Sequence, residues 1–420
     1  MSRFLFVVPP LVGHVNPTVG VAAALVDRGH QVAWAGAGEF VRSLVGPDAA
    51  VYSCAVPEFV DTCARRPPGL RGPASLKFLC ERFFIPLAEA MVPGVLEAVE
   101  RFVPDVLVVD LEAFAGWLVA ERMGLPWATS ATTTAAFTDP FSGTPKVEEW
   151  LRGIVTDLRH RCGAPDLGVT DKVGELWFSP RLVLAFTTSA LLGSTGHLGA
   201  QVRLVGPSIA PRPSAGDFPW DWLEAERPAV LVSLGTVNSD TGARFLGQCA
   251  RALAADPDRQ AVIVDPAGVL GAVAEHVLVQ RTVPQLRLLR HVDAVVCHAG
   301  HNTVSETLSH GLPLVVAPIR DDQPLVAQQV VDAGAGIRLR FSRATAAQIS
   351  LAVEAVLTEP SYRQAARRVR ETFRVAGGAA TAALHLEKLA ACGACPLDAG
   401  QDSDLRKNRT VSGVMDSAWR

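Results

Sequence analysis

Short apolar runs alternate with longer segments of helical periodicity along nearly the whole chain. In the first half, strands are expected at residues 3–8, 31–35, 105–109, 181–186 and 202–205. Helices are expected between these strands, over residues 17–28, 74–102 and 113–123. The alternation starts afresh with a strand at 229–234 and continues to about residue 340, before two final helices. This pattern is typical of an α/β fold with two doubly wound, Rossmann-like domains that face each other across a cleft.

A stretch rich in proline and glycine separates the two halves. Residues 206–223 read G-P-S-I-A-P-R-P-S-A-G-D-F-P-W-D-W-L, and proline continues neither a helix nor a central strand. We therefore expect an N-terminal domain over 1–205, a stiff linker over 206–227 and a C-terminal domain over 228–392. Residues 393–420 are small and polar, and we expect them to form a disordered tail.

The composition excludes several classes of partner. The chain has 420 residues and a net charge of −3, with acidic and basic residues interspersed, so it offers no basic surface for nucleic acid. No stretch approaches the roughly 18 uninterrupted apolar residues of a membrane span. The first apolar run breaks at Pro9, too early for a signal peptide, and eight scattered cysteines fit a reducing compartment. We therefore expect a cytoplasmic protein without a membrane span.

A turn in the second half has the properties of an anion site. The segment 297–306 reads C-H-A-G-H-N-T-V-S-E, with a short apolar strand before it and a helix expected over 302–310. The start of a helix presents unpaired backbone N–H groups and the positive end of the helix dipole, which suits a pyrophosphate. A second strand end, at Ser233, Gly235 and Thr236, offers further hydroxyl and N–H groups for phosphate.

A histidine follows the first expected strand, where a doubly wound fold binds its ligands. The segment 11–17 reads L-V-G-H-V-N-P, with a histidine at position 14. The unperturbed pKa of a histidine, near 6.5, suits a general base that acts at neutral pH. Asp110 ends the run V-L-V-V-D at the same sheet edge and is placed to orient the histidine. The alternative interpretations are a loop histidine and an aspartate that only caps the next helix.

Three clusters in the second half together resemble a known donor-binding signature. They are R-T-V-P-Q at 281–285, the segment 297–306, and P-I-R-D-D-Q at 318–323. Their order and spacing resemble those of the inverting, UDP-dependent glycosyltransferases that decorate small lipophilic molecules, which include plant secondary-product enzymes and bacterial macrolide, carotenoid and antibiotic glycosyltransferases. The resemblance covers most of the chain. It implies a glycosyltransferase B fold whose last helix, at about 379–391, crosses back onto the N-terminal domain.

The resemblance also implies a role for each matching residue. His14 would remove the proton from the acceptor hydroxyl, with Asp110 as its partner. The donor phosphates would be bound by Ser233, Gly235, Thr236, His298, Gly300, Asn302 and Thr303. The nucleoside would be bound by Arg281, Thr282, Val283, Gln285 and Glu306, with Glu306 accepting from the ribose hydroxyls. Asp322 and Gln323 would hold the hydroxyls of the transferred sugar.

One position departs from the family pattern. Many members have tryptophan where this chain has Thr282, and that tryptophan stacks on uracil. Arg281 offers a guanidinium plane instead. UDP and dTDP therefore both remain open as the nucleotide of the donor.

The expected activity is inverting transfer of a hexose or deoxyhexose from a UDP- or dTDP-sugar to a hydroxyl of a hydrophobic natural product. No cofactor or metal is expected, because the N–H groups and side chains of the phosphate site neutralise the charge of the leaving diphosphate and no metal-ligand cluster appears in the sequence. A catalytically silent partner protein of the same fold and a sugar-nucleotide epimerase are the alternatives. The chain is expected to be a monomer or homodimer.

The acceptor site is the least specific part of the sequence. Aromatic side chains of the first domain either line an apolar pocket or belong to the core, and their helical spacing favours the core. They are Phe78, Phe83, Phe84, Phe114, Trp117, Phe137 and Phe141.

Overall fold

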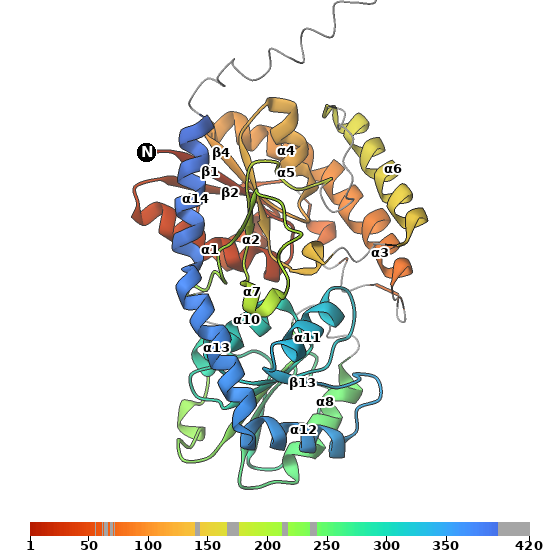
Figure 1. The fold of residues 1–420 in the computed structure, drawn as a ribbon, viewed down its shortest axis with the longest axis vertical. Helices are drawn as coiled ribbons and strands as arrows, with labels where there is room; N and C mark the ends of the chain where they lie inside the picture. The colour runs from red at the N-terminus through yellow and green to blue at the C-terminus, as the bar shows by residue number, and fades with distance from the viewer. Residues whose placement is uncertain are drawn as a thin grey trace, which may run out of the picture.

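Two domains stacked along the long axis make up the molecule (Figure 1). The computed structural model describes residues 1–54, 56–60, 62, 66–67, 70, 72–138, 143–165, 176–211, 217–235 and 242–393. One domain contains a 7-stranded sheet in the order β3-β2-β1-β4-β5-β6-β7, and the other a 6-stranded sheet in the order β10-β9-β8-β11-β12-β13. All strand pairs are parallel. The expected fold class is thereby confirmed.

The N-terminal sheet is formed by strands separated by helices. Its strands are β1 Arg3–Val7, β2 Gln31–Gly36, β3 Val51–Ser53, β4 Val106–Asp110, β5 Trp127–Ala131, β6 Val183–Ala185 and β7 Val202–Leu204. Its helices are α1 Val12–Asp27, α2 Gly38–Val45, α3 Pro73–Leu79, α4 Ile85–Phe102, α5 Phe114–Met123, α6 Pro145–Cys162 and α7 Ser189–Leu192. A π-helical turn at Cys80–Phe84 joins α3 to α4, so the region expected as one long helix is nearly continuous.

The C-terminal sheet repeats the same plan. Its strands are β8 Ala229–Ser233, β9 Gln260–Val264, β10 Val277–Gln280, β11 Ala294–Cys297, β12 Leu314–Val316 and β13 Gly336–Arg338. Its helices are α8 Ala243–Ala254, α9 Gln285–Leu288, α10 His301–Ser309, α11 Gln323–Asp332, α12 Ala346–Thr358 and α13 Pro360–Ala376, followed by α14 Gly378–Gly393.

Each sheet is buried on both faces, which explains why its strands are almost wholly apolar. In β1, Leu5 and Val7 pack into one core cluster, whereas Phe4 and Phe6 pack into the cluster on the opposite face. Successive side chains of a strand point to opposite faces, so a strand between two helical layers needs apolar residues at every position. The β8 strand divides its side chains between two clusters in the same way.

The first helix begins earlier than the sequence pattern predicts. Helix α1 starts at Val12 rather than at Pro17, so His14 lies in its first turns and not in a preceding loop. A proline inside a helix removes one hydrogen bond, and this is why the pattern placed the helix boundary there. The helix tolerates Pro17 because the carbonyl that loses its donor is used elsewhere, as described below.

The last helix returns to the first domain. Helix α14 runs alongside α1 on the N-terminal domain (Figure 1). Its Ala382, Ala383 and Leu386 are fully buried in the core cluster that also contains Phe4 and Phe6. At the surface Glu387 accepts hydrogen bonds from Arg28 at 2.7 and 2.8 Å and from His30 Nε2 at 2.7 Å. The chain end is thus tied to the first domain by apolar burial and by a small charged cluster.

We predict that Glu387→Gln lowers the melting temperature by about 1–3 °C at neutral pH, as expected for a partly exposed ion-pair network. The hydrogen bond from Arg28, with that from His30, lowers the pKa of Glu387 from 4.5 to about 2. A lowered pKa stabilises the fold above the ordinary value, and the contribution is lost as the pH falls towards 2. Calorimetric melts should therefore show the wild type and the variant converging on acidification. Glu371→Gln, which removes a carboxylate that pairs with Arg374 within α13, is the control and should change the melting temperature little.

Candidate active site

A cavity of about 1950 Å³ lies between the two domains. The carboxyl ends of β1 and β4 border it from one side, and those of β8 and β11 from the other, because both sheets reverse their strand order at these pairs. His14 and all described residues of the predicted donor site line the cavity. These donor-site residues are Ser233, Gly235, Arg281, Thr282, Val283, Gln285, His298, Gly300, Asn302, Thr303, Glu306, Asp322 and Gln323. Thr236, also predicted for the phosphates, lies outside the described residues.

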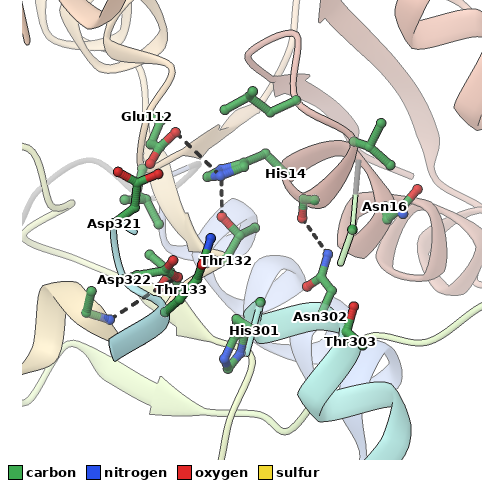
Figure 2. Close-up of a pocket in the computed structure, with 18 of the residues that line it drawn as sticks. His14, Asn16, Glu112, Thr132, Thr133, His301, Asn302, Thr303, Asp321 and Asp322 are labelled. Atoms are coloured by element: carbon green, nitrogen blue, oxygen red, sulfur yellow. Dashed lines mark hydrogen bonds and ion pairs between the residues drawn. The ribbon is translucent and has the colours of Figure 1, made fainter. Parts of the chain in front are cut away.

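His14 and Asp110 form a hydrogen-bonded pair beneath the cavity. His14 Nδ1 lies 2.8 Å from Asp110 Oδ1, and the Asp110 side chain is fully buried at the end of β4. Asp110 is held in turn by the backbone N–H of Glu112 at 2.9 Å and by the hydroxyl of Thr132 at 3.0 Å. This arrangement fixes the ring so that Nδ1–H donates to Asp110 and Nε2 faces the cavity. Figure 2 shows the ring of His14 between Glu112 and Thr132.

The pKa of His14 differs from the ordinary value of a histidine. Burial lowers the pKa of His14, but the charges of Asp110 and Glu112 and the hydrogen bond to Asp110 outweigh burial and raise it to about 10. A carboxylate near each ring nitrogen favours the charged form. The sequence gives only the unperturbed value near 6.5, because it does not show how many carboxylates meet at one ring.

Glu112 is a residue that sequence reasoning missed. Its Oε2 lies 3.4 Å from His14 Nε2, and burial raises the pKa of Glu112 to about 7 although His14 opposes the shift. The sequence could have indicated Glu112 by its position, two residues after the strand end at Asp110. Thr132 and Thr133 follow β5 at the same edge and were likewise missed, although a run of threonines after a buried strand is visible in the sequence.

The turn after β11 packs a histidine against two glycines. A Cβ placed on Gly300 would lie 2.3 Å from His298 Nε2, and one on Gly235 would lie 2.9 Å from the same atom. Both positions therefore require glycine. Burial lowers the pKa of His298 to about 4, and the Ser233 backbone offsets only part of this, so the ring is neutral at pH 7. A neutral imidazole serves a phosphate as a hydrogen-bond donor and not as a charge.

Helix α10 points its first turn into the cavity. It begins at His301, one residue earlier than predicted, and no side chain caps its N-terminus. The N–H groups of its first turn are consequently available to an anion. Thr303 lies in this turn and lines the cavity, as the predicted phosphate site requires.

Asn302 connects the two domains. Its side-chain amide donates to the backbone carbonyl of Gly13 at 2.7 Å (Figure 2). Pro17 lies four residues after Gly13 and has no N–H to donate, so this carbonyl lacks its usual partner within helix α1. The proline thereby supplies a hydrogen-bond acceptor at the domain interface. The Asn302 side chain is thus used between the domains in this structure, whereas the sequence placed it at the diphosphate.

The predicted nucleoside residues lie around the start of α9. Gln285 Nε2 donates to Glu306 Oε2 at 2.6 Å, which holds the buried carboxylate of Glu306 at the cavity wall. Arg281 and Thr282 are exposed at the rim and Val283 is half-buried. The structure thus brings together residues from two separated sequence clusters.

The two aspartates before α11 both reach the other domain. Asp322 accepts a hydrogen bond from Thr133, and Asp321 pairs with the buried Arg66 and lies 3.3 Å from Ser75 Oγ. Asp321 has a positive φ of 58°, a conformation that costs energy for a residue other than glycine. Gln323 turns back to accept from the backbone N–H groups of residues 319 and 320, at 2.9 and 3.1 Å. Nothing in the sequence signalled the pairing of Arg66 with Asp321.

The part of the cavity inside the first domain is apolar. Helices α3 to α6 and the π-helical turn between α3 and α4 form its wall, with Leu76, Leu79, Phe84, Ile85, Phe114, Val147, Leu151 and Ile154. Three of the aromatic residues considered from sequence, Phe84, Phe114 and Phe137, are buried in the core clusters, as preferred, and also line the cavity. The preference for the core is also right for Phe83 and Trp117, which are fully buried.

Two more of these aromatic residues do not line the described wall, and two others were missed. Phe78 is half-buried outside the lining, and Phe141 lies outside the described residues. Trp177, which stacks on Phe114 with the ring centroids 5.7 Å apart, and Phe178 line the cavity and were missed. Their sequence signal was weak because they lie outside the regular elements.

Among the residues that the structure describes, no group of three or more His, Cys, Asp or Glu side chains is arranged to hold a metal ion. In the same part of the chain, no helix is long and apolar enough to cross a membrane.

Residues 206–373 match the family described as UDP-glucoronosyl and UDP-glucosyl transferase. A relative from Lentzea aerocolonigenes, 4'-demethylrebeccamycin synthase, is 32% identical over 413 residues, which cover 89% of this chain and 96% of the relative.

The fold also matches solved structures. The glycosyltransferase of kitacinnamycin superposes with a TM-score of 0.73 at 24% identity, over 92% of this chain and 98% of that one. The spinosyn rhamnosyltransferase SpnG, solved with thymidine diphosphate, gives a TM-score of 0.70 at 22% identity, over 92% of this chain and 100% of its own. With the histidine–aspartate pair and the helix start on one cavity, these likenesses lead to one conclusion: the chain belongs to the UDP-glucoronosyl and UDP-glucosyl transferase family, and it is a glycosyltransferase of the two-domain B fold.

Proposed function

We propose that this glycosyltransferase moves a hexose or deoxyhexose from a UDP- or dTDP-sugar to a hydroxyl group of a hydrophobic natural product, with inversion at the anomeric carbon. The observation that carries the proposal is the position of the pair His14 and Asp110 opposite the N-terminus of α10, both at one cavity between the domains. One domain supplies a proton acceptor, and the other supplies donors for a leaving diphosphate.

The reaction follows from the position of the proton acceptor in one domain opposite the hydrogen-bond donors of the other. The acceptor hydroxyl gives its proton to His14 Nε2, while its oxygen attacks the anomeric carbon on the face opposite the nucleotide. The bond from that carbon to the diphosphate oxygen breaks, and the electron pair leaves with the diphosphate. The first N–H groups of α10 and the neutral ring of His298 stabilise the leaving charge. We propose that the reaction needs no metal ion, because these groups supply the stabilisation themselves.

The substrates are proposed at the level of chemical class. The apolar wall formed by helices α3 to α6 favours a large hydrophobic acceptor, in agreement with the rebeccamycin compound in the name of the Lentzea relative. The family description points to a UDP-sugar and the thymidine diphosphate of the spinosyn enzyme to a dTDP-sugar, so both nucleotides belong to the proposal. A silent partner protein and an epimerase are not favoured, because the site retains its base and its donor residues.

A cytoplasmic location and a monomeric or homodimeric state complete the proposal. Five cysteines of the described residues are buried as free thiols, which fits a reducing compartment. They are Cys54, Cys80, Cys162, Cys249 and Cys297.

We predict that His14→Ala lowers kcat/KM for transfer by about 10²–10⁴-fold, the usual contribution of a general base. Nucleotide binding should be unchanged, because the phosphate and nucleoside residues all lie in the other domain. Transfer is measured by chromatography of glycosylated product from a panel of hydrophobic hydroxylated acceptors. His160→Ala, an exposed histidine on α6, serves as the control. Full activity in the His14 variant would contradict the proposed role of this residue.

We also predict that UDP or dTDP binds the wild-type protein in the presence of EDTA. His298→Ala should weaken that binding by about 10–100-fold, because the phosphate loses one hydrogen bond in a buried site. Isothermal titration calorimetry measures both affinities. His276→Ala removes a histidine that contacts the Leu253 carbonyl in the same domain, away from the cavity, and should leave binding intact. Wild-type binding that requires a divalent ion would refute the metal-free mechanism.

A further inference from the structure

The catalytic histidine lies between two carboxylates, one at each ring nitrogen. Asp110 Oδ1 is 2.8 Å from Nδ1, and Glu112 Oε2 is 3.4 Å from Nε2. The first contact is the familiar orienting bond of a histidine–aspartate pair. The second contact is unexpected, because Nε2 is the atom that must receive the proton of the acceptor. The Glu112 carboxylate thus lies in the direction from which the acceptor hydroxyl has to approach.

Glu112 is built into the same hydrogen-bonded unit. Its backbone N–H donates to Asp110 Oδ1 at 2.9 Å, so the loop after β4 places the two acidic residues in a fixed relation to each other. Its side chain lines the cavity and is 22% exposed, whereas that of Asp110 is fully buried. Glu112 is therefore free to move into the cavity, and Asp110 is not.

The other charges around this unit come from both domains. Helix α11 of the donor domain brings Asp322 close enough to affect both His14 and Glu112, and Asp321 adjoins it. Arg66 of the acceptor domain pairs with Asp321, and the remaining contact of the ring is the neutral hydroxyl of Thr132. Without a cation at His14, Glu112 and Asp110 would repel each other. The positive charge of the imidazolium form of His14 lies between these two carboxylates.

We propose that Glu112 is a positioning residue for glycosyl transfer: its carboxylate holds the Nε2 side of His14 before the acceptor enters and stays beside the ring as a second counter-ion when His14 receives the acceptor proton. This inference rests on the proposed function of His14 as the base.

The proposal gives Glu112 a defined part in each step. When the acceptor enters, its hydroxyl takes the place of the Glu112 carboxylate at Nε2, the Nε2 proton passes to solvent, and the carboxylate stays charged beside the ring. The acceptor O–H bond then breaks and an N–H bond forms at Nε2, as the oxygen bonds to the anomeric carbon. The new positive charge lies between Asp110 and Glu112, which favour it. Glu112 touches neither sugar nor phosphate in this scheme and acts through His14.

The test is the titration of His14 in the Glu112→Gln protein, which keeps the side-chain shape and removes the charge. With histidine labelled by ¹³C, the ring signal of His14 among the ten histidines is assigned from its absence in His14→Ala. We expect the pKa of His14 to fall by about 1–2 units in Glu112→Gln, as for the loss of one carboxylate at this distance. Glu97→Gln, an exposed carboxylate on α4 that pairs with Arg101, should leave it unchanged. Glu112→Asp should restore part of the shift.

The pH dependence of kcat/KM should shift in the same direction as the pKa of His14. A base must be unprotonated to act, so the acid limb of the kcat/KM profile should move to lower pH in Glu112→Gln, by the same amount as the titration. A role in folding alone would change activity without moving this limb. An unshifted limb and an unshifted His14 titration in Glu112→Gln would overturn the proposal for Glu112 alone. Full activity of His14→Ala would instead overturn the proposed function and, with it, the part played by Glu112.

Discussion

The direction of the parallel strands is the constraint on which the site depends. Every strand in a parallel sheet presents its carboxyl end at the same edge, and each sheet here reverses its strand order at one pair, β1 with β4 and β8 with β11. His14 lies in the helix after β1, Asp110 and Ser233 are the last residues of β4 and β8, and His298 directly follows β11. Because the two edges face each other, residues almost three hundred positions apart in the sequence share one cavity.

Polar contacts close the cleft between the domains. Asn302 binds the Gly13 carbonyl that Pro17 releases, Asp321 and Asp322 reach Arg66 and Thr133, and Thr134 donates to Gln329 at 2.8 Å. These contacts join the two domains across the cleft. Asn302 and Asp322, which the sequence predicts for the donor site, therefore also hold the two domains together.

The electrostatics of the site depend on burial as much as on charge. Burial lowers the pKa of His298 to about 4, whereas the carboxylates around His14 outweigh burial and raise its pKa to about 10. The two histidines therefore start from opposite protonation states, although both are cavity residues of one enzyme. The neutral ring suits a hydrogen bond to phosphate, and the charged ring shows where the positive charge of the transition state will be stabilised.

The sequence alone determined the two-domain α/β fold and the residue types of the site, because apolar alternation and short motifs are local properties. His14, His298 and Glu306 follow from motifs of a few residues, and the structure brings all three to the cavity. Only the tertiary structure decided three other features. They are the second carboxylate at His14, the pairing of Arg66 with Asp321, and the choice of the aromatic residues that line the pocket. Each depends on which side chains converge from distant segments, and neither spacing nor composition records that convergence. The pKa of His14 belongs to the same class, because it is set by the charges that the fold gathers around the ring.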